Sequence, residues 1–591
     1  MKQDLPMNGA DMLVGFSRVD TDPEDEKGPF YMPLGGYGNN HLRISVRGAA
    51  VGAETETPYG LKATCIAVTG TNGETVLLYT VDLTVIVSSV TARLRNAIRE
   101  VFPDIPENNI FFTATHTHSG PDMTNSDTSH PFIDYDGRET TCKANAERYL
   151  NMFESQIVRA ASEAMADRKR VTEIRTGTVD TVDSDGKNLN FVRHYSLVAN
   201  GHREVFLGTL ASNMNYTGKT CIVNGVTYKT VLGTYMSDPN TNMMLVRFDR
   251  EGGKSVVFVN YRAHAYVQSG SLASNQEVRQ HYSPDFVGPF CKNVEEQAGV
   301  LCAFYQGDAG NITPTSSITA DMPASFRDDW HNFEKYGRLL AAFAVSALQS
   351  STALSVVKGE RTVSTAREQY AALFRNKDYY QLDGETQAIV DEMCEYFTAN
   401  YGRYENGVHL YKLSAINAMA SKSNGLVHSY YHAARIRSRQ KLTKETFDVE
   451  LNAVNIAGLA FTEAPYEMFD SDGDIIRNGG AALGYQNVFV MGYSNDSLFY
   501  VPSELGFTQG YDSSMPPMSV PYSYVDVNGN TVSGTAPHET MIGSYEADQC
   551  QFVPALDKNG VAIYGTKENG DPIYVGEDLA AHLVKLLESI R

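Results

Sequence analysis

Apolar runs separated by short turn signals dominate the first part of the chain. Residues 61–70 (LKATCIAVTG) and 75–87 (TVLLYTVDLTVIV) are two such runs, and the TNGE segment between them is typical of a tight turn. This pattern predicts a hairpin of buried strands. Residues 109–121 (NIFFTATHTHSGP) and 255–267 (SVVFVNYRAHAYV) each start as an apolar run and continue into polar residues. The sequence therefore predicts buried strands whose ends carry polar side chains.

Segments with helical spacing alternate with these strands. They cover residues 89–101, about 143–168, 330–350 and 577–590, and a helix-rich block lies at about 365–440. Strand runs return after that block, so strands and helices are interleaved along the chain. The interleaving predicts a mixed α/β (α+β) fold. We expect one large body over residues 1–591, with a mixed β-sheet, flanking helices and the 365–440 block as a helical insertion.

Composition narrows the classes of partner. The chain has 591 residues, with 49 Lys plus Arg against 70 Asp plus Glu, so its formal net charge is −21. Such an acidic chain lacks the basic surface of a nucleic-acid-binding protein and does not favour an anionic membrane. We therefore expect a neutral or cationic ligand, or one held by a metal ion, and no nucleic-acid partner.

The sequence shows no targeting or membrane-spanning pattern. The N-terminal MKQDLPMNGADMLVG lacks the apolar core of a signal peptide, and polar residues interrupt the uncharged stretch at 339–357. Seven widely spaced cysteines without a Cys-x-x-Cys pattern indicate neither a thiolate zinc site nor a disulfide framework. We expect a cytoplasmic protein without a transmembrane segment, and its oligomeric state does not follow from the sequence.

A pair of histidines one residue apart gives the strongest chemical signal. In a strand, alternate residues lie on one face, so His116 and His118 would continue the face begun by Ile110, Phe112 and Ala114. Two neutral imidazoles at the end of a buried strand can bind a metal ion, or one can bind it while the other moves protons. The alternative is a pair of solvated histidines in a turn.

Two other patterns give weaker signals. His428 and His432 have the i,i+4 spacing of metal sites on helices, but Ser429 stands where the zincin pattern needs a Glu, so a helix surface is the simpler interpretation. Residues 470–474 (DSDGD) resemble the start of a calcium loop. Ile475 stands where that loop needs glycine, so we expect a tight turn.

Five segments, in one order along the chain, carry a resemblance to a known family. They are THTHSGP at 115–121, AHAYVQSG at 263–270, Gly310 to Pro314, Pro465 to Glu467, and Asn495 to Pro502. They resemble segments of the neutral (non-lysosomal) ceramidases, zinc-dependent amidases that cut the N-acyl bond of ceramide. The N-terminal MLVGFSRVD and PLGGYG are similar too, so the resemblance spans roughly residues 11–550. It implies a hydrolase of sphingolipid metabolism.

The resemblance implies a Zn²⁺ ion held by residues from four distant segments, namely His116, His264, Glu467 and Tyr500. Two imidazoles, a carboxylate and a phenolate form a nitrogen and oxygen set that suits zinc. Zinc in such a site lowers the pKa of a bound water toward neutrality. The alternatives are that Glu467 is a surface acid and that Tyr500 belongs to the core.

The resemblance also implies residues for proton transfer and substrate binding. His118, two residues from a zinc ligand, would be the acid/base. Arg193 would orient the polar head of the substrate, and Thr313 stands where the family usually has Ser, which keeps the hydroxyl. A later tyrosine, either Tyr511 or Tyr545, would help to hold the oxyanion.

Three departures from the family affect the substrate rather than the metal. No signal peptide is seen, and no C-terminal immunoglobulin-like domain is expected. Ala265, Tyr266 and Val267 differ from the usual small, hydroxyl-bearing run, and Ser497 stands where a tyrosine is common. We expect hydrolysis of ceramide (N-acylsphingosine) to sphingosine and fatty acid. The alternatives are a zinc hydrolase of another small amide or ester, and a non-catalytic binding relative.

Overall fold

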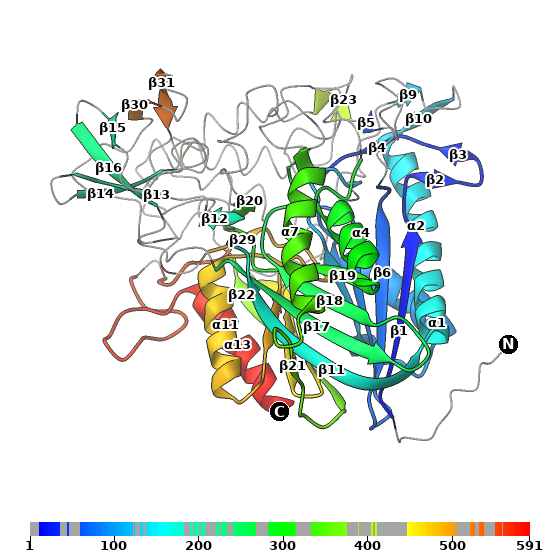
Figure 1. The fold of residues 1–591 in the computed structure, drawn as a ribbon. Coiled ribbons are helices and arrows are strands. Elements are labelled where there is room, and N and C mark those ends of the chain that lie inside the picture. Colours follow the sequence, from blue (N-terminus) through cyan, green and yellow to red (C-terminus); the bar gives the residue numbers. More distant parts are fainter. Residues whose placement is uncertain are drawn as a thin grey trace.

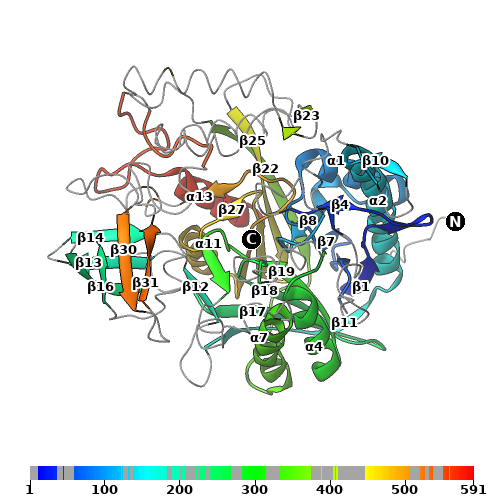
Figure 2. The same cartoon turned by 90° about the horizontal axis from the view of Figure 1, so that it is seen from above.

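Two packed β-sheets form the centre of the protein, and helices cover the outer face of each sheet (Figures 1 and 2). The computed structural model describes residues 11–35, 44–45, 59–121, 123, 131–133, 138–182, 189–192, 195–199, 202–206, 220–223, 226–232, 240–267, 282–314, 332–374, 388, 404–405, 408–409, 446–502, 504, 507, 520–525, 531–536, 550–557 and 559–591. The order of layers, from helices through two sheets to helices, confirms the predicted mixed α/β class.

The larger sheet has nine strands and carries a parallel pair at each end. Its strands follow the order β19 (Leu301–Gln306), β18 (Val256–Tyr261), β17 (Asn242–Arg250), β11 (Lys169–Asp180), β1 (Leu13–Asp20), β6 (Lys62–Thr69), β7 (Thr75–Val81) and β8 (Ile110–Ala114), and β21 (Ser355–Val356) pairs with β11. The parallel pairs are β18 with β19 and β7 with β8. β6 and β7 form the predicted hairpin, with Thr69 opposite Thr75.

The smaller sheet has four strands and packs on one face of the larger one. Its strands follow the order β22 (Val363–Leu373), β25 (Thr446–Ile456), β26 (Leu459–Glu463) and β28 (Val488–Met491). The two sheets meet in one buried apolar cluster, where the ring of Phe258 contacts those of Phe461 and Phe489. Removal of this apolar surface from water holds the two sheets together.

Helices complete both outer faces. Their bounds are Ser88–Val101 (α1), Cys142–Ala166 (α2), Val287–Ala298 (α4), Asn332–Gln349 (α7), Asp470–Ala482 (α11) and Val575–Ser589 (α13), with a short 3₁₀ helix η2 at Glu107–Asn109. α1 and α2 cover one half of the larger sheet, α4 and α7 cover its other half, and α11 and α13 cover the smaller sheet. The helices predicted at residues 89–101, about 143–168, 330–350 and 577–590 are therefore confirmed. Among the described helices, we find none with the length and apolar character needed to cross a membrane.

Short strands form outlying sheets around these layers. Six of them pair in the order β14 (His202–Phe206), β13 (Tyr195–Ala199), β16 (Val226–Leu232), β15 (Thr220–Val223), β30 (Val520–Val525) and β31 (Thr531–Ala536). The others pair as β2 (Glu24–Asp25) with β3 (Gly28–Pro29), β4 (Met32–Pro33) with β5 (Ile44–Ser45), β9 (Pro131–Ile133) with β10 (Glu139–Thr141), β12 (Asn190–Val192) with β20 (Ile312–Pro314), β23 (Tyr404–Glu405) with β24 (Val408–His409), and β27 (Glu467–Met468) with β29 (Tyr500–Val501). β20, β27 and β29 carry residues of the candidate site.

The larger sheet curls so that its two parallel pairs approach each other. The Thr80 hydroxyl on β7 donates to the carbonyl of Phe304 on β19 at 2.6 Å. The Tyr305 hydroxyl on β19 donates in turn to the carbonyl of Leu78 on β7 at 2.8 Å. β8 runs parallel to β7, and β18 runs parallel to β19. The carboxyl ends of β8 and β18 therefore meet at one end of the sheet. Both strands run directly into segments that bear histidines.

Two predictions about local structure are wrong. Residues 363–373 pair along their whole length with β25, so the predicted helical insertion does not begin at 365. The hydrogen-bonded ladder overrides the polar composition of this strand. The segment from 375 to 445, apart from isolated short pieces, lies outside the described residues. Residues 470–474 form the first turn of α11 rather than a tight turn, because acidic side chains favour a helix N-terminus.

Candidate metal centre

Three buried imidazoles converge at the meeting point of the strand ends. His116 and His118 follow β8, and His264 follows β18. The Nε2 atom of His116 lies 3.1 Å from Nε2 of His264 and 3.1 Å from Nε2 of His118. All three side chains are buried, with 2%, 7% and 0% of the residue exposed. A group in which one nitrogen from each ring lies within 4.8 Å of the others can bind a metal ion.

The chain brings His116 and His118 together by a turn rather than by strand alternation. β8 ends at Ala114, and His116 has a φ of 59°, in the left-handed region that non-glycine residues rarely adopt. The backbone amide of His118 donates to the carbonyl of Ala265 at 2.8 Å, which ties the two histidine segments together. The predicted convergence of the pair is correct, but its stated cause, a shared strand face, is wrong. Such a backbone outlier is typical of functional sites.

Hydrogen bonds to the backbone fix the tautomer of two of the rings. Nδ1 of His116 lies 2.7 Å from the carbonyl oxygen of Thr84, and Nδ1 of His264 lies 2.7 Å from that of Ala309. A carbonyl can only accept, so each Nδ1 carries a proton and donates it. In the neutral rings each Nε2 therefore presents a lone pair to the centre of the cluster. This is the tautomer that a metal-binding histidine uses.

A carboxylate completes the cluster and adds negative charge. Oε2 of Glu467, on β27, lies 3.4 Å from Nε2 of His116 and 3.4 Å from Nε2 of His264. Two lone pairs and a carboxylate oxygen that face one another within 3.4 Å repel unless positive charge lies among them. The donor set of imidazole nitrogens and a carboxylate oxygen therefore fits a divalent cation, and zinc prefers these ligands.

Strand pairing places Tyr500 beside this carboxylate. β27 and β29 are parallel, and Glu467 pairs with Tyr500 in their register. Residues opposite each other in a ladder project to the same face, so the two side chains start from neighbouring positions. Tyr500 is 8% exposed and belongs to the same buried cluster as Tyr493. The ring of Tyr493 lies 4.1 Å from that of His116, between centroids.

Thr313 lies on a short strand that is bonded to the His264 segment. It is the middle residue of β20, and the His264 amide donates to the carbonyl of the preceding Ile312 at 3.1 Å. Thr313 is buried, and its hydroxyl hydrogen-bonds the hydroxyl of Tyr266. The structure thus brings together His116, His118, His264, Glu467, Tyr500 and Thr313 from the predicted set. Arg193, Tyr511 and Tyr545 lie outside the described residues, as do His428 and His432 of the competing pattern.

A buried aspartate supports the segment that leads to His116. The Thr115 hydroxyl donates to Oδ1 of Asp82 at 3.1 Å, and the Lys62 amide donates to its Oδ2 at 2.8 Å. Burial raises the pKa of Asp82 to about 6, against the effect of these two hydrogen bonds. Asp82 follows β7 as Thr115 follows β8, so this contact closes the parallel pair beside the site.

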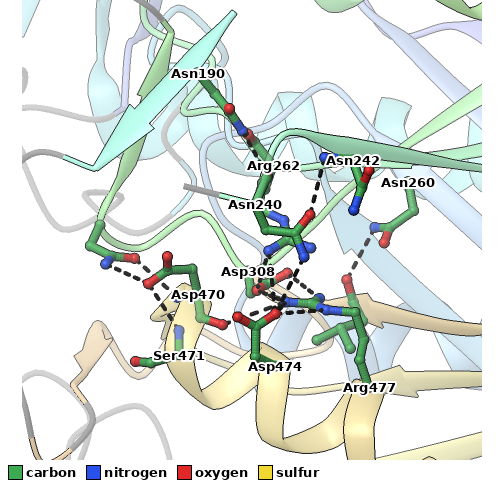
Figure 3. Close-up of polar contacts among 12 residues, drawn as sticks. Asn190, Asn240, Asn242, Asn260, Arg262, Asp308, Asp470, Ser471, Asp474 and Arg477 are labelled. Atoms are coloured by element: carbon green, nitrogen blue, oxygen red, sulfur yellow. Dashed lines mark hydrogen bonds and ion pairs between the residues drawn. The ribbon is translucent and has the colours of Figure 1, made fainter. Parts of the chain in front are cut away.

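A network of arginines and aspartates includes residues close in sequence to His264 and Ala309 (Figure 3). We call Arg262, Asp308, Asp474 and Arg477 the arginine–aspartate network. Arg477 on α11 donates to both carboxylate oxygens of Asp308, at 3.0 and 2.8 Å, and to Asp474 at 2.7 Å. Nη1 of Arg262 lies 3.4 Å from Oδ2 of Asp308. Arg262 lies two residues before His264. Asp308 directly precedes Ala309, whose carbonyl accepts the hydrogen bond from Nδ1 of His264.

Sequence reasoning missed several supporting groups. The carbonyls of Thr84 and Ala309 carry no sequence signal, since every residue has a carbonyl. Tyr493 was missed as well, and Asn495 was named only as the first residue of a resembling segment, with no role; both adopt left-handed backbone, with φ of 57° and 65°. Asn495 holds the strand next to the site, because its Oδ1 accepts from the amide of Phe112 at 2.9 Å. An asparagine after a buried strand was the available signal, because asparagine tolerates left-handed backbone.

Comparison with known proteins supports the fold. No family model matches the chain, and no curated protein matches its sequence. Among solved structures, a neutral ceramidase from Pseudomonas aeruginosa is similar, with a TM-score of 0.52, 15% identity, and coverage of 83% of this chain and 69% of that one. A ceramidase complexed with C2 has a TM-score of 0.56, 15% identity, and coverage of 98% and 75%. The chain therefore shares the neutral ceramidase fold, and the predicted resemblance is confirmed at that level.

Proposed function

We propose that the protein is a zinc-dependent amidohydrolase that cleaves the N-acyl bond of ceramide or a closely related lipid amide. The observation that carries this proposal is the convergence of two fixed Nε2 lone pairs and the Glu467 carboxylate on one point. A non-catalytic binding protein has no need of a third imidazole beside such a centre. The shared fold with two ceramidases supports the choice of substrate class.

Four residues would hold the metal, namely His116, His264, Glu467 and Tyr500. When bound, zinc supplies a Lewis acid and a nucleophile that is available at neutral pH. The chain's own contribution is a buried cradle, since backbone hydrogen bonds tie the His116 segment to the His264 segment and β27 to β29. Rigid ligands keep the coordination geometry fixed during the reaction.

His118 would move protons during amide hydrolysis. Its Nε2 lies within the cluster, 3.1 Å from Nε2 of His116, and its side chain is the most exposed of the three histidines. An imidazole there can donate a proton to the leaving amine, which is otherwise a poor leaving group. Thr313 would donate its hydroxyl proton to the substrate carbonyl oxygen as negative charge develops there. Arg193 and Tyr511 remain proposals from the resemblance.

Metal analysis and a substrate screen test this function together. Purified protein should contain about one zinc per chain, chelation should abolish hydrolysis, and added zinc should restore it. Fluorescent N-acylsphingosine should yield free sphingosine. If metal-free protein keeps full activity, the zinc centre is wrong. If only a short polar amide or an ester is cleaved, the zinc hydrolase stands and its substrate is the alternative one.

A further inference from the structure

Tyr266 lies beside the histidine cluster. Its ring centroid lies 5.8 Å from that of His118 and 5.6 Å from that of His264. Both histidines are buried, whereas Tyr266 is partly exposed. Tyr266 thus adjoins two residues of the candidate site and is itself accessible to a molecule in the solvent.

The backbone fixes the point from which the Tyr266 ring projects. The Tyr266 amide donates to the carbonyl of His264 at 3.0 Å, and the carbonyl of Ala265, the residue before it, accepts from the His118 amide at 2.8 Å. The ring itself contacts the rings of His118 and His264. These contacts make the ring a wall beside the two histidines.

The hydroxyl of Tyr266 meets the hydroxyl of Thr313, which is buried on β20. A phenol is a better donor than an aliphatic alcohol, so the phenol donates and the threonine oxygen accepts. The Thr313 hydroxyl then keeps its own proton for another acceptor. The bond to Tyr266 sets the direction in which that proton points.

We propose that Tyr266 is the specificity-determining residue of this site. Its ring limits the bulk that a substrate can carry on the atom next to the scissile amide group, and its hydroxyl orients Thr313 toward the carbonyl oxygen. The inference rests on the proposed amide hydrolysis. The substrate class that fits is an N-acyl amide with unbranched carbon next to the amide group. One carbon more or less in an apolar pocket changes kcat/KM by about 10–200-fold.

The first test separates the ring from the hydroxyl with two variants. Tyr266→Ala removes both, and Tyr266→Phe removes only the hydroxyl. N-acylsphingosines with straight or 2-methyl-branched acyl chains probe the acyl side, and amides of straight or branched amines probe the other side. We expect at least about 10-fold discrimination by the wild type on one side, and its reduction to about 3-fold or less in Tyr266→Ala, through faster cleavage of the branched substrate. Tyr266→Phe should retain the discrimination.

The hydroxyl function is tested by a double-mutant cycle. Tyr266→Phe and Thr313→Val should each lower kcat about 10-fold with little change in KM, as the loss of one transition-state hydrogen bond predicts. The double variant should be no slower than Thr313→Val alone, because both changes remove the same oriented proton. Losses that multiply would overturn the positioning role. Tyr266→Ser serves in place of Tyr266→Ala if the alanine variant lacks the wild-type melting curve or zinc content.

A binding measurement keeps the inference separate from the proposed activity. Calorimetry with zinc-loaded protein should show tighter binding of acetohydroxamate than of its branched 2,2-dimethylpropano analogue, and Tyr266→Ala should remove the difference. If no amide is cleaved but this preference appears and disappears as expected, the proposed function fails while the wall stands. If Tyr266→Ala changes neither the cleavage ratio on either side nor the hydroxamate preference, Tyr266 does not determine specificity.

Discussion

Two buried polar clusters lie next to each other at the same strand ends, and they balance charge in different ways. The histidine cluster gathers lone pairs and one carboxylate around a common point. The arginine–aspartate network gathers two guanidinium groups around two carboxylates. The clusters are neighbours in sequence as well, since His264 follows Arg262 by two residues.

The arginine–aspartate network pairs each guanidinium group with a carboxylate. Burial opposes the charge of Arg477, but the neighbouring carboxylate of Asp308 raises its pKa above the usual value. Burial and the nearby Arg477 lower the pKa of Arg262. The carboxylates of Asp308 and Asp474 partly offset this decrease. Every charge in this network thus faces an opposite one at 4 Å or less. Such a network stabilises the fold and positions whatever is attached to it.

The histidine cluster gathers groups of one kind. Its fixed tautomers present electron pairs to each other, and the nearest carboxylate adds negative charge. The contrast distinguishes a scaffold, in which each guanidinium group faces a carboxylate, from a set of electron-pair donors that suits a metal ion. The variants below test that distinction.

The largest expected effect comes from the metal ligands. His116→Ala and His264→Ala should each lose zinc and nearly all activity, because each removes a donor whose lone pair is fixed by a backbone bond. Added zinc should raise the melting temperature of the wild type but not of these variants. His582→Ala is the matched control. His582 lies on α13, is partly exposed, and contacts Glu368 on β22 rather than the candidate site. Zinc retained by both variants would place the metal elsewhere.

His118→Ala should separate metal binding from catalysis. We expect near-stoichiometric zinc and a turnover lowered by about 10²–10⁴-fold, the usual contribution of a general acid or base. The acid-side limb of the pH–rate profile should change as well. Metal analysis and turnover on the same preparation check this. If His118→Ala loses zinc while His116→Ala retains it, His118 is the metal ligand and His116 the acid/base.

Breaking the arginine–aspartate network should affect stability first. Asp308→Ala leaves Arg262 and Arg477 buried beside each other without their shared carboxylate, which costs about 3–5 kcal/mol of unfolding free energy. Asp474→Ala is the matched control, because Asp474 contacts the same Arg477 but has a side chain that is 37% exposed. Urea denaturation measures both. Equal losses in the two variants would contradict the role assigned to burial.

Most of the fold could be predicted from the sequence because its elements are strongly patterned. The hairpin at 61–87 and the helices at 89–101 and 143–168 combine apolar periodicity with clear turn signals. Strand β22 was not predicted, because it contains few apolar residues to alternate with its polar ones. Its pairing with β25, more than 70 residues away in the chain, supplies what the local pattern lacks.

The candidate site could be predicted only as a set of residues. The sequence singled out His116, His264 and Glu467, and the structure brings them within 3.4 Å of one another. Their geometry depends on the curl of the larger sheet and on carbonyls at Thr84 and Ala309, which no residue type encodes. The arginine–aspartate network was invisible for the same reason, since its members come from three separate elements.

A further buried acid, Glu463, offers the smallest and most graded test of the comparison. It is 1% exposed at the end of β26, and its Oε2 accepts from Nδ2 of Asn495 at 2.9 Å. Burial raises its pKa to about 8, although the bond from Asn495 opposes the shift. Glu463 therefore extends the comparison to a carboxyl group whose ionised form burial disfavours.

The raised pKa of Glu463 determines whether its contribution to stability rises or falls with pH. Between about pH 4.5 and 8 the folded protein holds a proton on Glu463 that the unfolded chain releases, so stability falls as pH rises, by about 1.4 kcal/mol per pH unit from this group. Glu463→Gln should remove that slope and be more stable than the wild type at pH 8. Glu450→Gln is the control: against the effect of burial, Arg95 lowers the pKa of Glu450, so its titration falls below this window. Urea denaturation of the three proteins from pH 5 to 9 measures the slopes, and a Glu463→Gln slope equal to that of the wild type would show that Glu463 is ionised throughout.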